Sequence, residues 1–272
     1  MRRSIRQMRL GSAVVLVVSA AALLAPWIAP YPYDVLDLAG NLSLPTAAHW
    51  LGQDELGRDI LSRLLFGARI SLSISLLAVG VSVTVGVLIG AAAGYIGGAV
   101  DTLVMRLVDI LLAFPGILLA IALAAVLGPG YFNVVFALSA LGWVGYTRLV
   151  RGQVLSERER DYVQAAQALG ASRWRVILRH LIPNIMAPVL VQATFGLGSA
   201  ILAESSLSFL GLGVQRFPSW GAMLDGGTDF LLTAPHLSTF PGLVILITVM
   251  GFNFLGDGLR DRLDPTRKRD YL

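Results

Sequence analysis

Residues 110–147 read ILLAFPGILLAIALAAVLGPGYFNVVFALSALGWVGYT, a run without a single Asp, Glu, Lys or Arg. A helix needs about 20 apolar residues to cross the hydrocarbon core of a bilayer, so this run is long enough for two crossings. Gly128-Pro129-Gly130 divides the run, because Gly-Pro and Pro-Gly pairs are strong turn signals. The stretch therefore predicts two membrane-spanning helices joined by a tight turn.

Uncharged runs of similar character recur along the chain, at 11–29, 70–100, 181–203 and 230–256. The composition agrees, since 56% of residues are hydrophobic and only 14% are charged, against about 25% charged in soluble domains. Lipid offers no partner for bare backbone groups, so the spans are expected to be helices. We predict an all-α polytopic membrane protein with six spans, at about 11–29, 70–94, 106–127, 131–150, 185–210 and 238–258.

The first uncharged run, at 11–29, could alternatively belong to a cleaved signal peptide. Arg2, Arg3, Arg6 and Arg9 would form its basic start, and small residues follow. The apolar part of a signal peptide is usually about 7–15 residues long, and this run is longer. The length favours a retained helix.

The basic residues predict the orientation. With six spans, both termini lie on one side, and only Arg58, Arg63, Arg69 and Arg216 of the 21 Lys and Arg residues fall on the other. Because basic residues concentrate in cytoplasmic loops, segments 1–10, 151–184 and 259–272 are expected to be cytoplasmic. Segments 30–69 and 211–237 then form outer, periplasmic loops. The net charge of +4 is a topology signal and does not indicate nucleic-acid binding.

Several chemistries are excluded by what the chain lacks. Lys268 is its only lysine and follows Arg267, so a Gly-Lys-Ser/Thr phosphate loop is impossible. Cysteine is absent, and His49, His180 and His236 are isolated from one another. We therefore expect no catalytic residue, no metal site and no cofactor bound by this chain.

An ion-coupled secondary transporter is the alternative from another functional class. Such proteins usually place ionisable groups near the middle of the membrane. Carboxylates within the spans are few, and Asp109 and Glu204 both lie near helix ends. They support ion coupling only weakly.

Two features of the spans point to a passage or to packing. Small residues recur at every fourth position of the second span: Ala78, Ser82, Gly86, Gly90, Gly94 and Gly98. Such a stripe lets helices approach closely, either as static packing or as a seam that slides against a partner. In the third span, Pro115 removes a helical hydrogen bond and predicts a kink that could line a passage.

Glu204 opens the segment Glu204-Ser205-Ser206-Leu207-Ser208 near the end of the fifth span. A carboxylate at membrane depth is a functional candidate by default. Glu204, Ser205 and Ser208 are therefore candidates for a gate or passage. The alternative is a buried hydrogen bond between the carboxyl group and the neighbouring hydroxyls.

The longest cytoplasmic segment contains YVQAAQALGASRWRVILRHLIPN (162–184). Asp161 is expected to cap a helix over 162–169, and Gly170 stands where a C-terminal glycine belongs. Ser172 is expected to cap a second helix, which Pro183 ends or restarts. The sequence thus predicts a helical hairpin.

One face of the second helix is apolar. It is formed by Trp174, Ile177, Leu178 and Leu181, at helical spacing. That pattern alone is compatible with a helix lying on the membrane surface. The first helix instead presents a small, alanine-rich face, which suits insertion into a protein groove.

The hairpin resembles the cytoplasmic loop signature of binding-protein-dependent ABC importer permeases. That signature is Glu-Ala-Ala, three residues, Gly, nine residues, then Ile-x-Leu-Pro. Ala165, Ala166, Gly170 and Pro183 match in register, whereas Gln164 replaces the glutamate, and His180 and Ile182 replace Ile and Leu. The replacement of the glutamate puts one charge contact in doubt.

The resemblance extends over nearly the whole chain. Five separated segments are similar to the dipeptide, oligopeptide and nickel permease family, and to its second permease subunit in particular. They are HWLGQDELGRDILSRLLFGARISL (49–72), LLAFPGILLAIALA (111–124), ILAESSLSFLGLG (201–213), PSWGAML (218–224) and LGDGLRDRLDP (255–265).

The resemblance implies a type I ABC importer permease fold in the bacterial inner membrane, with a transmembrane core over 70–258. It implies a heterodimer with a homologous permease, two cytoplasmic ATPases that bind ATP and Mg, and an external substrate-binding protein. The ATPase-coupling loop would be carried by Tyr162, Gln164, Ala165, Ala166, Leu169, Gly170, Arg173 and Pro183. Peptides are the favoured cargo and nickel is the alternative within the family.

Overall fold

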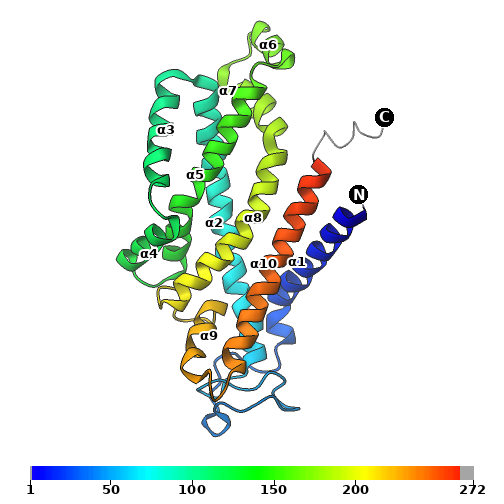
Figure 1. The fold of residues 1–272 in the computed structure, drawn as a ribbon, viewed down its shortest axis with the longest axis vertical. Helices are drawn as coiled ribbons and strands as arrows, with labels where there is room; N and C mark the ends of the chain where they lie inside the picture. Colours follow the sequence, from blue (N-terminus) through cyan, green and yellow to red (C-terminus); the bar gives the residue numbers. More distant parts are fainter. Residues whose placement is uncertain (1, 264–272) are drawn as a thin grey trace.

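The computed structural model describes residues 2–263, and within that range the chain folds into helices without a β-strand (Figure 1). The long helices are α1 (Arg2–Ile28), α2 (Ile60–Ile96), α3 (Gly98–Leu112), α4 (Gly116–Leu127), α5 (Tyr131–Glu157), α8 (Ile182–Phe209) and α10 (His236–Leu263). The short ones are α6 (Asp161–Ala168), α7 (Arg173–Val176) and α9 (Trp220–Gly226). Arg267, Lys268 and Arg269, which belong to the segment predicted to be cytoplasmic, lie outside the described residues.

The membrane-spanning character of the chain is confirmed. Five helical segments are long and apolar enough to cross a bilayer, namely Arg6–Ile28, Ile60–Ile96, Tyr131–Glu157, Arg173–Phe209 and His236–Leu263. A sixth crossing is possible if α3 and α4 count together as one broken span. The fold is all-α and polytopic, with five or six spans in the described part of the chain.

The expectation of one kinked helix over 106–127 is wrong. The chain turns by 85° between α3 and α4, and Pro115 is the residue that immediately precedes α4. Proline disfavours the helical conformation of the residue before it, so the preceding helix ends rather than bends. The result is two short helices, of 15 and 12 residues, in place of one continuous helix.

The outer loop predicted over 30–69 is too long at its C-terminal end. Helix α2 already begins at Ile60, because the Asp59 carboxylate accepts hydrogen bonds from the backbone N–H and the hydroxyl of Ser62, at 2.8 and 2.7 Å. This N-cap satisfies donors that the first helical turn leaves free. Residues 60–69 are therefore helical and continue without a break into the uncharged run that begins at Ile70.

Pro183 neither ends nor restarts a helix, contrary to the prediction. A π-helical turn (η2, Ile177–Leu181) joins α7 directly to α8, so one continuous helical segment runs from Arg173 to Phe209. Pro183 stands in the first turn of α8, where an α-helix tolerates a proline. The wider π turn before it changes the backbone pairing at the place where proline lacks a donor.

The most extensive contact between long helices is the seam between α2 and α5. A Cβ added at Gly86 would lie 2.8 Å from the backbone oxygen of Trp143, and one added at Gly90 would lie 2.6 Å from that of Thr147. Only glycine lets the two backbones come this near. The small-residue stripe of α2 therefore packs within this chain, which is the static alternative.

Helix α1 lies along α10 in a second glycine seam. A Cβ at Gly11 would approach the backbone of Leu255 to 2.5 Å, and one at Gly251 would approach Val14 to 2.6 Å. These contacts make α1 part of the helical bundle, as a retained first span requires. On the other side of the bundle, Asp101 of α3 pairs with Arg151 of α5 through both carboxylate oxygens, at 2.5 and 2.6 Å.

The two ends of the bundle differ in character. The α6–α7 hairpin projects from one end, and the first residues of α1 and the last turns of α10 point the same way (Figure 1). Helix α9 and the loop before α2 cover the opposite end. We call these the hairpin end and the α9 end.

The α2–α5 seam yields a matched pair of substitutions. We expect Gly90→Ala to lower the melting temperature of the detergent-solubilised protein, since overpacking costs about 1–3 kcal/mol. Gly80→Ala is the control, because a Cβ at Gly80 meets nothing within 4 Å and alanine is the better helix former by about 1 kcal/mol. Equal melting temperatures for the two variants would show that the seam does not constrain stability.

Candidate functional site

The hairpin is defined by two caps at adjacent positions. Gly170 has φ +81°, its N–H donates to the Gln167 oxygen at 2.9 Å, and the N–H of Ala171 donates to the Ala166 oxygen at 3.0 Å. This pair of bonds is a Schellman C-cap, in which glycine supplies the left-handed residue. Ser172 then accepts a hydrogen bond from the backbone N–H of Arg175 at 3.4 Å and starts the next helix. Both predicted caps are confirmed, whereas Asp161 is the first helical residue and not the cap.

Side-chain contacts hold the hairpin against the bundle. Val163 is fully buried, and the Gln167 amide donates to the Tyr95 hydroxyl at the end of α2, at 3.0 Å. The Tyr162 hydroxyl donates to Glu157 at 3.0 Å. Partial burial, together with that bond, raises the pKa of Tyr162, so the phenol keeps its proton and remains a donor at neutral pH.

The outward face of the hairpin is free. Leu169 is 88% exposed, and Gln164, Ala165, Gly170 and Arg173 are also exposed. Ala166 is half-buried, and Pro183 is exposed on the flank of α8 rather than on the hairpin itself. Leu169 thus leaves a large apolar side chain at the end of the hairpin that the core of the described chain does not cover.

The predicted apolar face of the second helix divides in two. Ile177 and Leu181 are buried, whereas Trp174 and Leu178 are 59% and 53% exposed. Residues four apart share a helical stripe, so 177/181 and 174/178 form neighbouring stripes. Only the first of them packs into the bundle, and the second adds to the exposed surface of the hairpin end.

At the α9 end, a polar joint connects three helices. The Trp220 ring nitrogen donates to the Leu64 oxygen of α2 at 3.1 Å, and its backbone N–H donates to Ser71 at 3.4 Å. A Cβ at Gly221 would lie 2.2 Å from the Ser205 oxygen of α8, so this glycine permits the close approach of α9. The joint fixes α9 on α2 and α8.

Glu204 lies inside this joint and is fully buried. One carboxylate oxygen accepts a hydrogen bond from the Ser208 hydroxyl at 2.7 Å. The hydroxyls of Ser71, Ser205 and Ser219 surround the carboxyl group, although its second oxygen and the Ser205 hydroxyl have no partner of good geometry. The three gate candidates of α8 are thus brought together in a buried cluster, as the hydrogen-bonding alternative describes.

A separate groove of about 370 Å³ runs along the bundle between four helices. Helix α2 contributes Ala78, Val79 and Ser82, and α4 contributes Gly116, Ile117 and Ala120. Helices α5 and α8 contribute Leu138, Leu141, Gly142, Gly145, Tyr146, Gln192, Phe195, Gly196, Ser199, Ala200 and Ala203. Pro115 and Glu204 each adjoin a lining residue in sequence, Gly116 and Ala203, but none of the four passage candidates lines the groove itself.

The groove is lined mainly by small and apolar residues, with a few polar groups among them. A Cβ at Gly145 or Gly116 would meet nothing within 4 Å, so these glycines leave open space. Tyr146 is 5% exposed and its hydroxyl lies over Gly196, without a partner among the described residues. No side chain caps the first turn of α4, so its N–H groups remain donors. Irregular backbone at membrane depth is tolerated where it lines a cavity.

Sequence reasoning missed most of this groove. Gly145, Tyr146, Gln192 and Ser199 belong to no recognised motif, and they meet only because α5 and α8 lie together. The sequence feature that could have pointed to the groove is Gln192. Apart from Asn184 near the start, it is the one amide side chain in the uncharged run 181–203. Among the described residues, no group of three or more His, Cys, Asp or Glu could hold a metal ion.

Comparison with known sequences gives a family match. Residues 86–269 match the family described as "Binding-protein-dependent transport system inner membrane component". The match covers the glycines of the α2–α5 seam, the hairpin and helices α4, α5, α8 and α9, but not the first part of α2.

Three relatives are similar over almost the entire chain. The probable D,D-dipeptide transport system permease protein DdpC of Escherichia coli (strain K12) is 44% identical over 93% of this chain and 86% of its own length. The dipeptide transport system permease protein DppC of Alkalihalophilus pseudofirmus is 45% identical over 91% of this chain and 82% of its own. The glutathione transport system permease protein GsiD of Pectobacterium atrosepticum is 44% identical, with 93% and 85% covered.

Proposed function

The chain belongs to the family of binding-protein-dependent transport system inner membrane components, and we propose that it is a permease subunit of an ABC importer that carries peptides across the bacterial inner membrane. It is a multi-pass transport permease and not an enzyme. The observation that carries the peptide assignment is that its relatives are named for D,D-dipeptide, dipeptide and glutathione transport. These names favour peptides over nickel.

ATP hydrolysis belongs to partner subunits in this proposal. The chain has no phosphate loop, so ATP and Mg would be bound by two cytoplasmic ATPases. The exposed hairpin face around Leu169 supports docking to such a partner. Movement there would pass through the continuous helical segment Arg173–Phe209 to the joint at the α9 end.

The orientation follows the charge distribution. Both termini and the hairpin are cytoplasmic, and α9 faces the external substrate-binding protein. A second, homologous permease completes the passage as the other half of a heterodimer. The glycine-lined groove of α4, α5 and α8 is this chain's side of that passage, and the Glu204 joint supports the outer gate beside it.

Peptide transport through the groove can be blocked without straining the backbone. We expect Gly145→Leu to reduce dipeptide uptake by proteoliposomes containing the complete transporter by at least about tenfold, because the side chain fills the groove. Gly152→Leu is the control, since it lies two helical turns further along α5, outside the groove and with equally open space. Undiminished dipeptide uptake by Gly145→Leu, or uptake of nickel in place of peptide by the wild type, would contradict the proposal.

The C-cap of the hairpin should couple ATP hydrolysis to transport. Placing valine at the left-handed Gly170 costs about 1–2 kcal/mol, so the intact cap becomes about 5–30 times rarer. We expect Gly170→Val to lower peptide uptake per ATP hydrolysed. Gly128→Val imposes the same strain at φ +79° far from the hairpin and should leave that ratio unchanged. Wild-type coupling in a normally expressed Gly170→Val transporter argues against the role of the cap.

The orientation is testable with single cysteines, because the chain has none of its own. Leu169 on the hairpin and Leu232 at the α9 end are 88% and 100% exposed. We expect Leu232→Cys to react with an impermeant maleimide added outside intact spheroplasts, and Leu169→Cys to react only after lysis. Labelling of both from one side would overturn the topology.

A further inference from the structure

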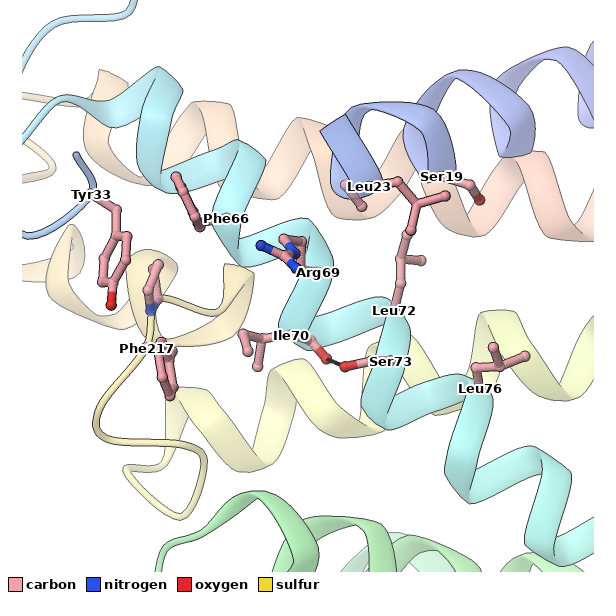
Figure 2. A pocket seen from close by; sticks show the side chains of 12 residues that line it. Ser19, Leu23, Tyr33, Phe66, Arg69, Ile70, Leu72, Ser73, Leu76 and Phe217 are labelled. Carbon is pink, nitrogen blue, oxygen red and sulfur yellow. Dashed lines mark hydrogen bonds between the residues drawn. The ribbon is translucent and has the colours of Figure 1, made fainter. Parts of the chain in front are cut away.

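A second cavity, of about 620 Å³, lies at the α9 end between α1 and α2. Most of its lining is apolar or aromatic, including Leu23 of α1 and Leu72 and Leu76 of α2 (Figure 2). Arg69 is the only charged residue in the lining. Figure 2 shows its guanidinium turned toward the end of the pocket where Phe66 and Tyr33 lie.

The guanidinium of Arg69 has no partner among the described residues. Its neighbours along the chain differ in this respect. Arg58 pairs with Asp54 and Glu55, at 2.8 and 2.7 Å, and Arg63 also pairs with Asp54. Arg69 is exposed and no acidic side chain lines the pocket, so its guanidinium is available to an anionic group from outside this chain.

The position of Arg69 along α2 matches the surface of the hydrocarbon core. The uncharged run of this helix begins at the next residue, Ile70. The rings of Tyr33 and Phe66, which also line the pocket, lie 4.8 Å apart in a tilted arrangement, and aromatic side chains are enriched at the membrane–water interface. The charge therefore lies at the level of lipid headgroups.

An exposed apolar strip leads from the pocket along α2 into the membrane. Leu76, Leu77 and Val81 are 63%, 45% and 45% exposed. From Arg69 to Val81 the helix rises about 18 Å, close to half of the roughly 30 Å hydrocarbon core. One cationic site followed by an apolar strip of one leaflet's length has the dimensions of a phospholipid.

We propose that this pocket binds a phospholipid of the outer leaflet, with its phosphate on Arg69 and an acyl chain along Leu72 and Leu76. A guanidinium is the side chain best suited to bind a phosphate, because its N–H groups form a planar fork. The site lies apart from the peptide groove. At about 100° per residue, Arg69 and Leu76 lie on the face of α2 opposite Ala78 and Ser82, which line that groove. A peptide in the groove would therefore not reach the guanidinium.

The test is native mass spectrometry of the complete transporter, extracted from vesicles of phosphatidylglycerol and phosphatidylethanolamine and washed with detergent. We expect the wild type to retain a phospholipid that Arg69→Gln holds at least about tenfold more weakly, since a charge-assisted hydrogen bond is lost. Arg69→Lys should retain it in part. Arg216→Gln is the control, because Arg216 is exposed at the same end, also unpaired, and outside the pocket.

Three outcomes would overturn the proposal. Retention by Arg69→Gln equal to that of the wild type would show that the guanidinium holds no lipid. Displacement of the bound species by excess inorganic phosphate would show that a free anion and not a lipid occupies the pocket. Loss of the second permease from the Arg69→Gln complex, with lipid binding unchanged, would assign the missing counter-charge to a carboxylate of that subunit.

Discussion

The contact between the backbones of α2 and α5 is the constraint on which the rest of the structure depends. Hydrophobic burial does not drive helices together within lipid, so close packing of small residues has to do so. Gly86, Gly90 and Gly94 supply it along three successive turns of α2. The seam fixes α5, and α5 in turn carries the ion-paired α3, one wall of the groove and the start of the hairpin.

Much of the fold follows from physical rules that act locally. Uncharged runs predicted the spans, and Gly170 and Ser172 predicted the two hairpin caps, because each cap depends on residues within one turn of it. The errors concern where helices begin, break or continue, which the runs of uncharged residues do not specify. The N-cap bond from Ser62 to Asp59 lengthens α2, and the π turn before Pro183 lets α7 continue into α8. Hydrophobic periodicity does not predict the 85° break next to Pro115. It also does not predict which side of the second hairpin helix packs against the bundle.

The candidate site shows the same division. The hairpin residues form one continuous segment, so the sequence was sufficient to identify them. The sequence identified three polar residues at membrane depth, Glu204, Ser205 and Ser208. The buried cluster that they form depends on α9, a short helix in the segment between α8 and α10. The groove was missed because its members are small residues on four helices, and smallness alone does not distinguish a helix contact from open space. Gly90 and Gly145 look alike in sequence, yet one touches a backbone and the other touches nothing.

The uninterrupted helix from Arg173 to Phe209 has a mechanical consequence. Its 37 residues make a rod about 55 Å long, so a tilt of about 5° about one end carries the other end about 5 Å. The hairpin is attached at one end of this rod, and Glu204 lies in the last two turns at the other. Small angular changes at the hairpin are thereby amplified into displacements comparable to one helical turn at the joint.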